Sequence, residues 1–350
     1  MEPQDDILEL LRKESAAIAK MKQRALIIQP GAIGDCILTL PLAAFMKERL
    51  GLGSVNMLGH TEYIGFLPGR SCIDSVSSID TVDLHRLFVK PAKFELADRD
   101  PLINVFSGYP WIVTLMGELG SDFEQNLIFT ANCTHGSEVI TLPAAPPKGS
   151  RQHVSEFYIR QFVEQCGSSL PDSLADTKSR MISADRGDRE IGRKLLTDYG
   201  VDADSRVVII HPGSGGQKKC WHLDNVLAVG DKLGKQGYSV LFLLGPAEVD
   251  RFGGKIIREI QSIGIQVSDL QLAQVLGLLT CADTFIGNDS GIMHLSAALG
   301  VRTVAMFGPT EPAMYGPVGP ATTVLKGSGR TFSSKSTPKL QEKLLKAIGS

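Results

Sequence analysis

One segment late in the chain, residues 284–311, constrains the fold more than any other stretch. Residues 284–287 form an apolar run typical of a strand, and residues 288–291 are turn and helix N-cap types. Residues 292–299 then place apolar side chains at helical spacing, and a glycine follows where a helix would end. Residues 301–307 are a second strand-like run. This order predicts a βαβ unit, which belongs in a parallel sheet.

The turn inside this unit has two possible roles. Its small residues leave backbone N–H groups free at a helix N-terminus, where a phosphate or diphosphate can bind. Asp289 and Ser290 are also the residue types that cap ordinary helices. Spacing alone leaves both interpretations open.

Composition narrows the class of protein. A chain of 350 residues, 43% of them hydrophobic, can form two domains with a core in each. The net charge of −2 provides no basic field for nucleic acid as the main partner. The six cysteines are scattered without a CxxC pair, the first 24 residues are rich in charge, and no apolar run reaches the ~18–20 residues of a membrane span. We expect reduced thiols and a cytoplasmic location, with peripheral membrane contact left open.

A similar strand–turn–helix pattern lies near the N-terminus. After an amphipathic helix predicted at 5–22, residues 24–29 read as a buried strand, 30–35 as a glycine-bearing turn and 36–50 as a helix. The turn lacks the GxGxxG dinucleotide fingerprint. Asp35 either caps this helix, stabilised by the helix dipole, or lies at the mouth of a ligand cleft.

The second half of the chain repeats the pattern. The buried strand 206–210 runs into a glycine-rich loop, 211–221, which lacks the ending of a Walker A motif but can offer backbone N–H groups and two lysines to a phosphate. The strand 238–244 is followed by a turn with Glu248 and by a helix predicted at 249–260. A final helix, 338–348, could reach back to the first domain.

Alternating strands and helices predict an α/β protein with two doubly wound parallel sheets facing each other across a cleft. We place the domains at residues 1–170 and 171–350. Ligands in such folds bind beyond the carboxyl ends of the strands, so the groups that follow strands should converge on one cleft. These groups are Asp35, the loop 213–219, Glu248 and residues 289–291. The other strands expected in the first domain are 55–58, 75–79, 102–105 and 138–142.

Four segments resemble the ADP-heptose:lipopolysaccharide heptosyltransferases, glycosyltransferase family 9. They are QPGAIGDCILTLP (29–41), HPGSGGQKKCW (211–221), LLGPAE (243–248) and GNDSGIMHLSAALGVRTVAMFGPTEP (287–312). The resemblance implies a GT-B fold of two Rossmann-like domains, with the acceptor on the N-terminal domain and the nucleotide sugar on the C-terminal one. It also implies a metal-independent reaction that inverts the anomeric centre.

The resemblance implies roles for single residues. Asp35 matches the family's catalytic base, Lys219 the lysine that binds the donor diphosphate, and Glu248 the acid near the adenosine ribose. His294 either contacts the donor or only closes a hydrogen-bond network. The full donor-binding set is Gly213, Ser214, Lys219, Glu248, Asp289, Ser290, Gly291, His294 and Thr310, and Gly31 and Gly34 shape the acceptor-side loop.

The implied activity is transfer of a heptose or related sugar from an ADP-sugar to a lipopolysaccharide core or related lipid-linked acceptor, with no other cofactor and no metal. The acceptor would be reached at the inner face of the inner membrane, and Arg86, Phe88, Lys90 and Lys93 are candidates for membrane contact. Three alternatives remain. They are a nucleotide-sugar epimerase on the same scaffold, a non-catalytic nucleotide-sugar-binding protein, and an NAD-dependent oxidoreductase, which the missing GxGxxG disfavours.

Overall fold

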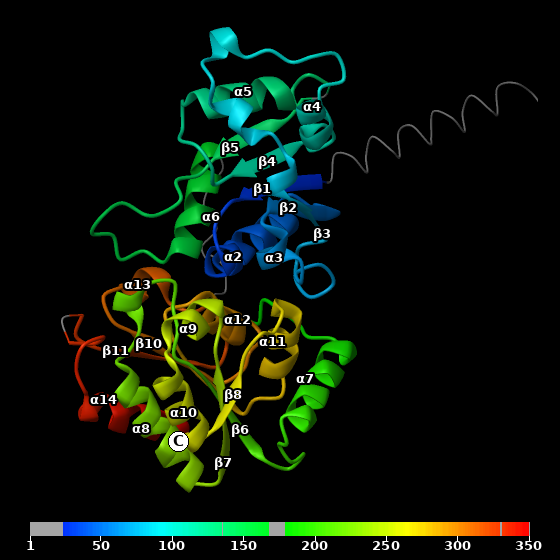
Figure 1. The fold of residues 1–350 in the computed structure, drawn as a ribbon. Helices are drawn as coiled ribbons and strands as arrows, with labels where there is room; N and C mark the ends of the chain where they lie inside the picture. Colours follow the sequence, from blue (N-terminus) through cyan, green and yellow to red (C-terminus); the bar gives the residue numbers. More distant parts are fainter. Residues whose placement is uncertain (1–23, 135, 168–178, 330, 350) are drawn as a thin grey trace, which may run out of the picture. The chain divides into compact units, whose positions relative to one another are not determined.

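The computed structural model describes residues 24–134, 136–167, 179–329 and 331–349 (Figure 1). The helix predicted at 5–22 and the predicted domain boundary at 170/171 lie outside these residues. The described residues form two compact units. The first contains those up to Gly31, then Thr39–Pro147, and those from Ser155 to residue 167. The second contains Ala32–Leu38, Lys148–Val154 and the described residues from 179 onward.

The first unit is built on a five-stranded sheet in the order β3-β2-β1-β4-β5, in which every strand pair is parallel. Helices cover both faces, so the central strands β1, β2 and β4 are buried along most of their length. In Figure 1, α4 and α5 lie on one face and α2 and α6 on the other. The strands are β1 (Arg24–Gln29), β2 (Ser54–Gly59), β3 (Ser75–Ser78), β4 (Trp111–Thr114) and β5 (Glu138–Thr141). The helices are α2 (Ile33–Arg49), whose residues up to Leu38 belong to the second unit, α3 (Thr61–Ile64), α4 (Pro101–Phe106), α5 (Asp122–Ala131) and α6 (Val154–Gln165), with short 3₁₀ turns η1 (Ile79–Thr81), η2 (Leu84–Phe88) and η3 (Pro91–Lys93).

One prediction for the first unit was wrong, and one strand was missed. The strand predicted at 102–105 is helix α4, because Asp100 accepts a hydrogen bond from Leu102 N as its N-cap and Pro101 occupies its first turn. Leu102 and Phe106, one helical turn apart, are then buried together. The strand paired with β1 on this side of the sheet is instead β4, which was not predicted.

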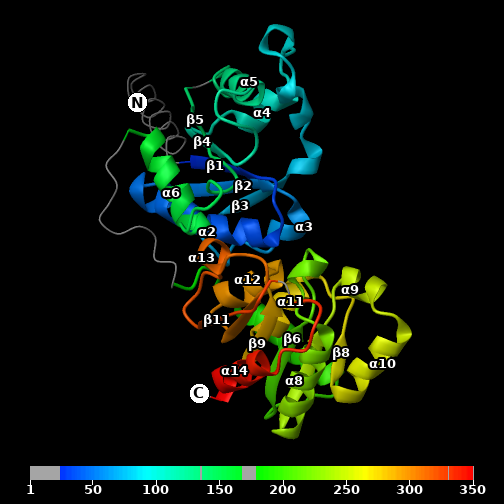
Figure 2. The ribbon, with the colours of Figure 1, turned by 90° about the vertical axis from the view of Figure 1, so that its left-hand side faces the viewer.

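The second unit has a six-stranded parallel sheet in the order β11-β10-β9-β6-β7-β8. Helices α8, α10 and α14 cover one face, and α7, α11 and α12 the other (Figures 1 and 2). The strands are β6 (Arg206–His211), β7 (Tyr238–Leu243), β8 (Ile265–Val267), β9 (Thr284–Asn288), β10 (Thr303–Phe307) and β11 (Thr322–Lys326). The helices are α7 (Arg186–Asp198), η4 (Gln217–Lys219), α8 (Leu223–Lys235), α9 (Pro246–Arg251), α10 (Gly254–Ile263), α11 (Leu272–Leu279), α12 (Gly291–Ala298), α13 (Pro312–Tyr315) and α14 (Pro338–Gly349).

The βαβ unit predicted from residues 284–311 is confirmed as β9–α12–β10. Thr303 lies opposite Phe285 in the parallel pair that these two strands form. Strand order reverses between β6 and β9, which are neighbours in the sheet although β7, β8 and the helices around them lie between the two in the chain. The carboxyl ends of these two strands are therefore the place where doubly wound sheets bind ligands.

Two details of the second unit differ from the prediction. The helix predicted at 249–260 is divided into α9 and α10 at Phe252 and Gly253, whose backbones are extended. The edge strand β11 was not predicted. The final helix, α14, belongs to the second unit. Its Leu340, Leu344 and Ile348 form one stripe, four residues apart, that is buried in the core of the second unit.

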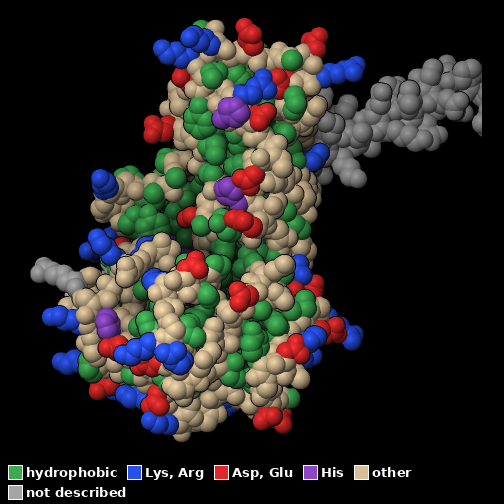
Figure 3. All heavy atoms as spheres, viewed as in Figure 1, with side chains coloured by type: hydrophobic (Ala, Val, Ile, Leu, Met, Phe, Trp, Pro, Cys, Tyr) green, Lys and Arg blue, Asp and Glu red, His purple; other side chains and the backbone are tan. Residues whose placement is uncertain are grey.

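The surface agrees with the near-neutral net charge. Acidic and basic side chains are interspersed over the face of the second unit drawn in Figure 3. Among the described residues, no helix combines the length and the apolar character that a membrane crossing requires.

Candidate active site

The candidate site lies at the carboxyl ends of β6 and β9. The glycine-rich loop follows β6, and Asp289 and Ser290 follow β9 and lead into α12. Ser290 caps α12, since its Oγ accepts a hydrogen bond from Met293 N at 3.3 Å. The capping role that the sequence left open is therefore real for Ser290, and it leaves the other N–H groups of the first turn for a ligand.

Asp289 is a buried carboxylate paired with the glycine-rich loop. Its Oδ2 lies 2.8 Å from Lys219 Nζ, and its Oδ1 lies 3.9 Å from His294 Nε2. Burial by itself raises the pKa of Asp289, but the neighbouring polar side chains of His294, Lys219 and Thr310 together with the lysine charge outweigh it and lower the pKa to about 2. The carboxylate is therefore ionised at neutral pH.

The loop and the β9–α12 turn are also joined through the backbone. Ser214 Oγ donates a hydrogen bond to the carbonyl oxygen of Asp289 at 2.5 Å, and Asp289 N donates to Met306 O at 3.1 Å. Asp289 is thus held from the β6 side by a side chain and from the β10 side by the sheet. Such bracing keeps its carboxylate and the neighbouring N–H groups in one geometry.

A cavity of about 410 Å³ opens beside this turn. All its lining residues belong to the second unit as its contacts define it. Nine of the residues predicted from the sequence meet there, namely Gly34, Asp35, Ser214, Lys219, Asp289, Ser290, Gly291, His294 and Thr310. Ala32, Leu38, Gly215 and Tyr315 complete the wall. The cavity combines a lysine and a helix N-terminus, which attract an anion, with an exposed carboxylate, which can accept a proton.

Asp35 combines the two roles considered for it. It lies in the first turn of α2, where its Oδ2 accepts a hydrogen bond from Ala32 N at 3.1 Å, and it lines the cavity. The backbone beside it approaches α12 closely. A Cβ on Gly34 would lie 3.1 Å from His294 Cδ2, and one on Gly291 would lie 2.8 Å from the Cβ of Ile33. Glycine is required at Gly291 because a larger residue would push the two segments apart.

Glu248, Gly213 and Gly31 do not line this cavity. Glu248 is 4% exposed, and its carboxylate accepts a hydrogen bond from Gly245 N and lies 3.4 Å from Arg251 Nη2. The Glu248 carboxylate therefore accepts a hydrogen bond from the backbone N–H at the start of its own helix, α9. Gly213 packs directly against it, since a Cβ there would lie 2.2 Å from the carboxylate. The expected convergence of all four groups on one cleft is thus incomplete, because Glu248 lies beneath the loop, against Gly213.

Sequence reasoning missed Tyr315, which lines the cavity at the end of α13. The only signal was its position five residues after Thr310 in the segment that follows β10. Within the part of the chain that the structure describes, no group of three or more His, Cys, Asp or Glu side chains is arranged to hold a metal ion.

Comparison with known proteins shows which family the chain resembles. The family model described as glycosyltransferase family 9 (heptosyltransferase) matches residues 151–344. Lipopolysaccharide heptosyltransferase 2 of Salmonella typhimurium is 27% identical over 124 residues, which are 34% of this chain and 35% of that protein. Lipopolysaccharide heptosyltransferase 3 of Escherichia coli is 25% identical over 291 residues, or 79% of this chain and 80% of that protein.

Among solved structures, the E. coli ADP-heptose lps heptosyltransferase II superposes with a TM-score of 0.69 at 17% identity, covering 93% of this chain and 98% of that one. At this identity the match shows the shared fold, the GT-B arrangement of two Rossmann-like parallel-sheet domains. The chain spans only about a third of the length of the Salmonella relative that it matches. Because the family model covers more than half of the chain, including β6, β9 and the loops that follow these two strands, the chain belongs to glycosyltransferase family 9, the heptosyltransferase family.

Proposed function

We propose that this protein is an inverting glycosyltransferase that moves a heptose, or a related sugar, from an ADP-sugar to a lipopolysaccharide core or related lipid-linked acceptor at the inner face of the inner membrane. One observation carries the proposal. A single cavity is lined by the carboxylate of Asp35, the Lys219–Asp289 pair and the N-terminus of α12. The names of the relatives, and the ADP-heptose in the name of the solved neighbour, support this choice of donor and acceptor.

In the proposed reaction the acceptor hydroxyl attacks the anomeric carbon from the face opposite the diphosphate. The new bond joins the acceptor oxygen to that carbon, and the bond from the carbon to the diphosphate oxygen breaks. The acceptor proton passes to Asp35, and general-base help of this kind is typically worth about 10²–10⁴-fold in rate. The departing diphosphate carries the released electron pair, and Lys219 and the α12 N–H groups stabilise its growing charge.

The proposal includes no metal ion, because Lys219 and the helix N-terminus supply positive potential where the diphosphate leaves. Transfer should therefore continue at an unchanged rate in excess EDTA, measured with metal-free buffers and substrates. Activity that disappears in EDTA and returns with Mg²⁺ would refute the metal-free form of the proposal while leaving the transferase activity itself established.

The decisive experiment is Asp35→Asn, which keeps the shape of the side chain and removes its basicity. Transfer from ADP-heptose should fall by about 10²–10⁴-fold, while the affinity for ADP, measured by calorimetry, stays within about two-fold. Asp122→Asn is the matched control, because Asp122 also lies in the first turn of a helix, α5, and it should leave both quantities unchanged. Full activity in Asp35→Asn would show that Asp35 only caps α2.

Donor identity has its own test. A ligand that binds only the folded protein raises the melting temperature by mass action. ADP and ADP-sugars should raise it well above the shifts produced by UDP, GDP and their sugars at equal concentration. A larger shift with a uridine or guanosine nucleotide would overturn the assignment of an adenine donor.

A further inference from the structure

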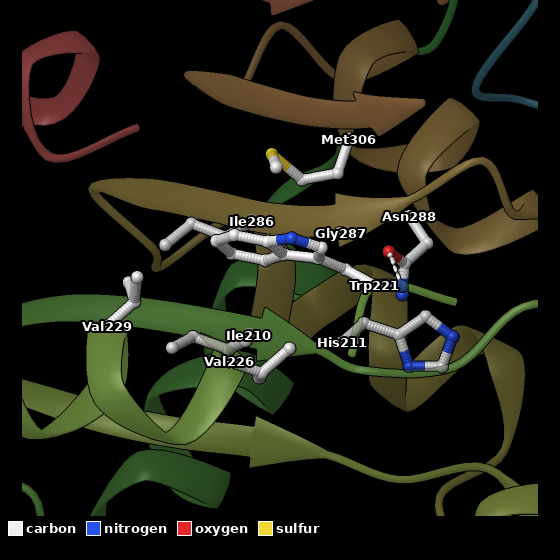
Figure 4. Close-up of a pocket in the computed structure, with 9 residues that line it drawn as sticks. All are labelled: Ile210, His211, Trp221, Val226, Val229, Ile286, Gly287, Asn288 and Met306. Atoms are coloured by element: carbon white, nitrogen blue, oxygen red, sulfur yellow. Dashed lines mark hydrogen bonds between the residues drawn. The ribbon is translucent and has the colours of Figure 1, made fainter. Parts of the chain in front are cut away.

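Asn288, the last residue of β9, is absent from the predicted site residues, yet its side chain contacts both ends of the glycine-rich loop. It is 2% exposed. Its Nδ2 donates to Pro212 O at 2.9 Å and to Gly213 O at 3.3 Å, and its Oδ1 accepts from Trp221 N at 2.9 Å. Figure 4 shows Asn288 joined to Trp221 in this way, beside His211 at the end of β6. One side-chain amide therefore connects the first residues of the loop to its last residue.

The middle of the loop has little packing to hold it. A Cβ added at Gly215 or Gly216 would meet nothing within 4 Å, so the middle of the loop is bordered by open space. Beneath its ends lies a cavity of about 10 Å³, roughly one water molecule in size, lined by apolar side chains with His211 and Asn288 (Figure 4). Trp221 at one end of the loop is buried in the core and Gly213 at the other packs against Glu248, and the hydrogen bonds of Asn288 join both ends to β9.

The position of the loop matters because two of its residues contact Asp289. Ser214 and Lys219 lie between the two ends, and both contact Asp289, the residue that follows Asn288. The loop backbone sets where the flexible side chain of Lys219 begins. The position of its ammonium group therefore depends on the position of the loop. Asn288 thus connects the end of β9 to the loop at the same place where Asp289 meets Ser214 and Lys219.

We propose that Asn288 is a positioning residue for the donor site, which holds the glycine-rich loop so that Lys219 and Ser214 face the diphosphate. The proposal rests on the proposed function for its ligand. Its chemistry is specific to an amide, because the site needs two N–H donors for Pro212 O and Gly213 O and one acceptor for Trp221 N. Aspartate has the same shape but no donor when ionised.

The test compares Asn288→Asp and Asn288→Ala with Asn225→Asp. Asn225 is an equally buried amide of the same unit, 0% exposed. It donates to Lys335 O and accepts from Ser336, Thr337 and Gln341, so it holds the segment before α14 and does not line the cavity. The variant proteins are compared at a temperature well below the melting temperature of each. The Ala variant avoids a buried charge and so serves if the Asp variant folds poorly.

The first readout needs no ligand. Trypsin cleaves after Lys218 and Lys219 faster when the loop leaves its place more often, and the fragments are identified by mass. Cleavage there should be about ten-fold faster in both Asn288 variants and unchanged in Asn225→Asp. Equal cleavage in the Asn288 variants and the unmodified protein would overturn the proposal.

The second readout is the affinity for ADP by calorimetry on the folded protein. Loss of the two donated hydrogen bonds should weaken ADP binding by about ten-fold or more, with Asn225→Asp within about two-fold of the unmodified protein. Faster cleavage with unchanged ADP affinity would overturn the role in donor binding. If the unmodified protein binds no adenine nucleotide, the proposed donor is wrong, and the cleavage readout still decides whether Asn288 holds the loop.

Discussion

Two aspartates, one in each unit, have the same unusual property in different surroundings. Asp100 in the first unit is 3% exposed and Asp289 in the second is 6% exposed. Hydrogen bonds and a neighbouring cation hold the pKa of each near 2. Each pairs at 2.7–2.8 Å with a cation that is partly exposed, Arg86 or Lys219.

The difference lies in what remains around the carboxylate. Arg86 binds both oxygens of Asp100, at 2.9 and 2.7 Å, and the backbone N–H groups of Ala97 and Leu102 complete the shell at the start of α4. Asp289, by contrast, lines a cavity of about 410 Å³. A lowered pKa therefore marks both a structural and a candidate functional carboxylate, and the open volume distinguishes them. Arg86, considered from the sequence as a membrane contact, is committed to the pair with Asp100.

The largest expected effect comes from removing the cation of the open pair. Lys219→Ala should lower kcat/KM for transfer by about 10²–10³-fold, because the departing diphosphate loses its fixed positive charge. Lys218→Ala, at the adjacent exposed lysine, is the control and should stay within about two-fold. Steady-state kinetics with ADP-heptose measure both. Equal losses in the two variants would mean that Lys219 provides only general positive charge.

The same removal in the closed pair should affect folding instead. Arg86→Ala should lower the free energy of unfolding by about 2 kcal/mol, between the values typical of exposed and of buried pairs, and leave kcat of the folded protein unchanged. Urea unfolding at pH 7 measures the first quantity. Arg186→Ala breaks an exposed pair with Glu190 and should cost less than about 0.5 kcal/mol. A fall in kcat for Arg86→Ala would contradict the distinction drawn between the two pairs.

Lowering the pH should weaken both carboxylate–cation pairs. A carboxylate whose pKa in the folded protein lies near 2, below the ordinary 3.8, contributes stability above about pH 4 that is lost as the pH falls toward 2. For Asp289 this lowering corresponds to about 2 kcal/mol. The difference in unfolding free energy between the unmodified protein and Asp289→Asn should therefore shrink between pH 4 and pH 2, and Asp100→Asn should behave alike. Only Asp289→Asn should impair transfer at pH 7. A difference in unfolding free energy that does not change with pH would show that the ionised carboxylate is not the source of the stability.

The smallest effect should come from adding a methyl group where the glycine-rich loop packs on Glu248. Gly213→Ala places a Cβ within 2.2 Å of the Glu248 carboxylate, so the loop or Glu248 has to move, and ADP binding should weaken by about ten-fold. Gly215→Ala adds a methyl group to open space in the same loop and should change ADP affinity less than about two-fold. Calorimetry compares them, and similar affinities for both variants would mean that the loop tolerates displacement.

Local patterns predicted well where the signal lies within one short segment. The β9–α12–β10 unit and the two glycine-bearing turns were found because strand, cap, helix and stop residues follow each other in order. The same reasoning failed at residues 101–106, where the apolar run Pro-Leu-Ile-Asn-Val-Phe suits a strand or a helix equally. The preceding Asp100 and Pro101 are a helix-start signal, and Asp100 owes its final geometry to Arg86, fourteen residues earlier in the chain.

By itself the sequence determined the fold class, the family and the residue types that gather at the carboxyl ends of the strands, because these depend on periodicity and on short motifs. Only the tertiary structure decided that Glu248 lies beneath the loop, that Tyr315 lines the cavity, and that Asn288 spans the loop's ends. Those outcomes depend on which segments distant in the chain become neighbours, as β6 and β9 do. Hydrogen-bond partners and burial are properties of that packing, and no spacing along the chain specifies them.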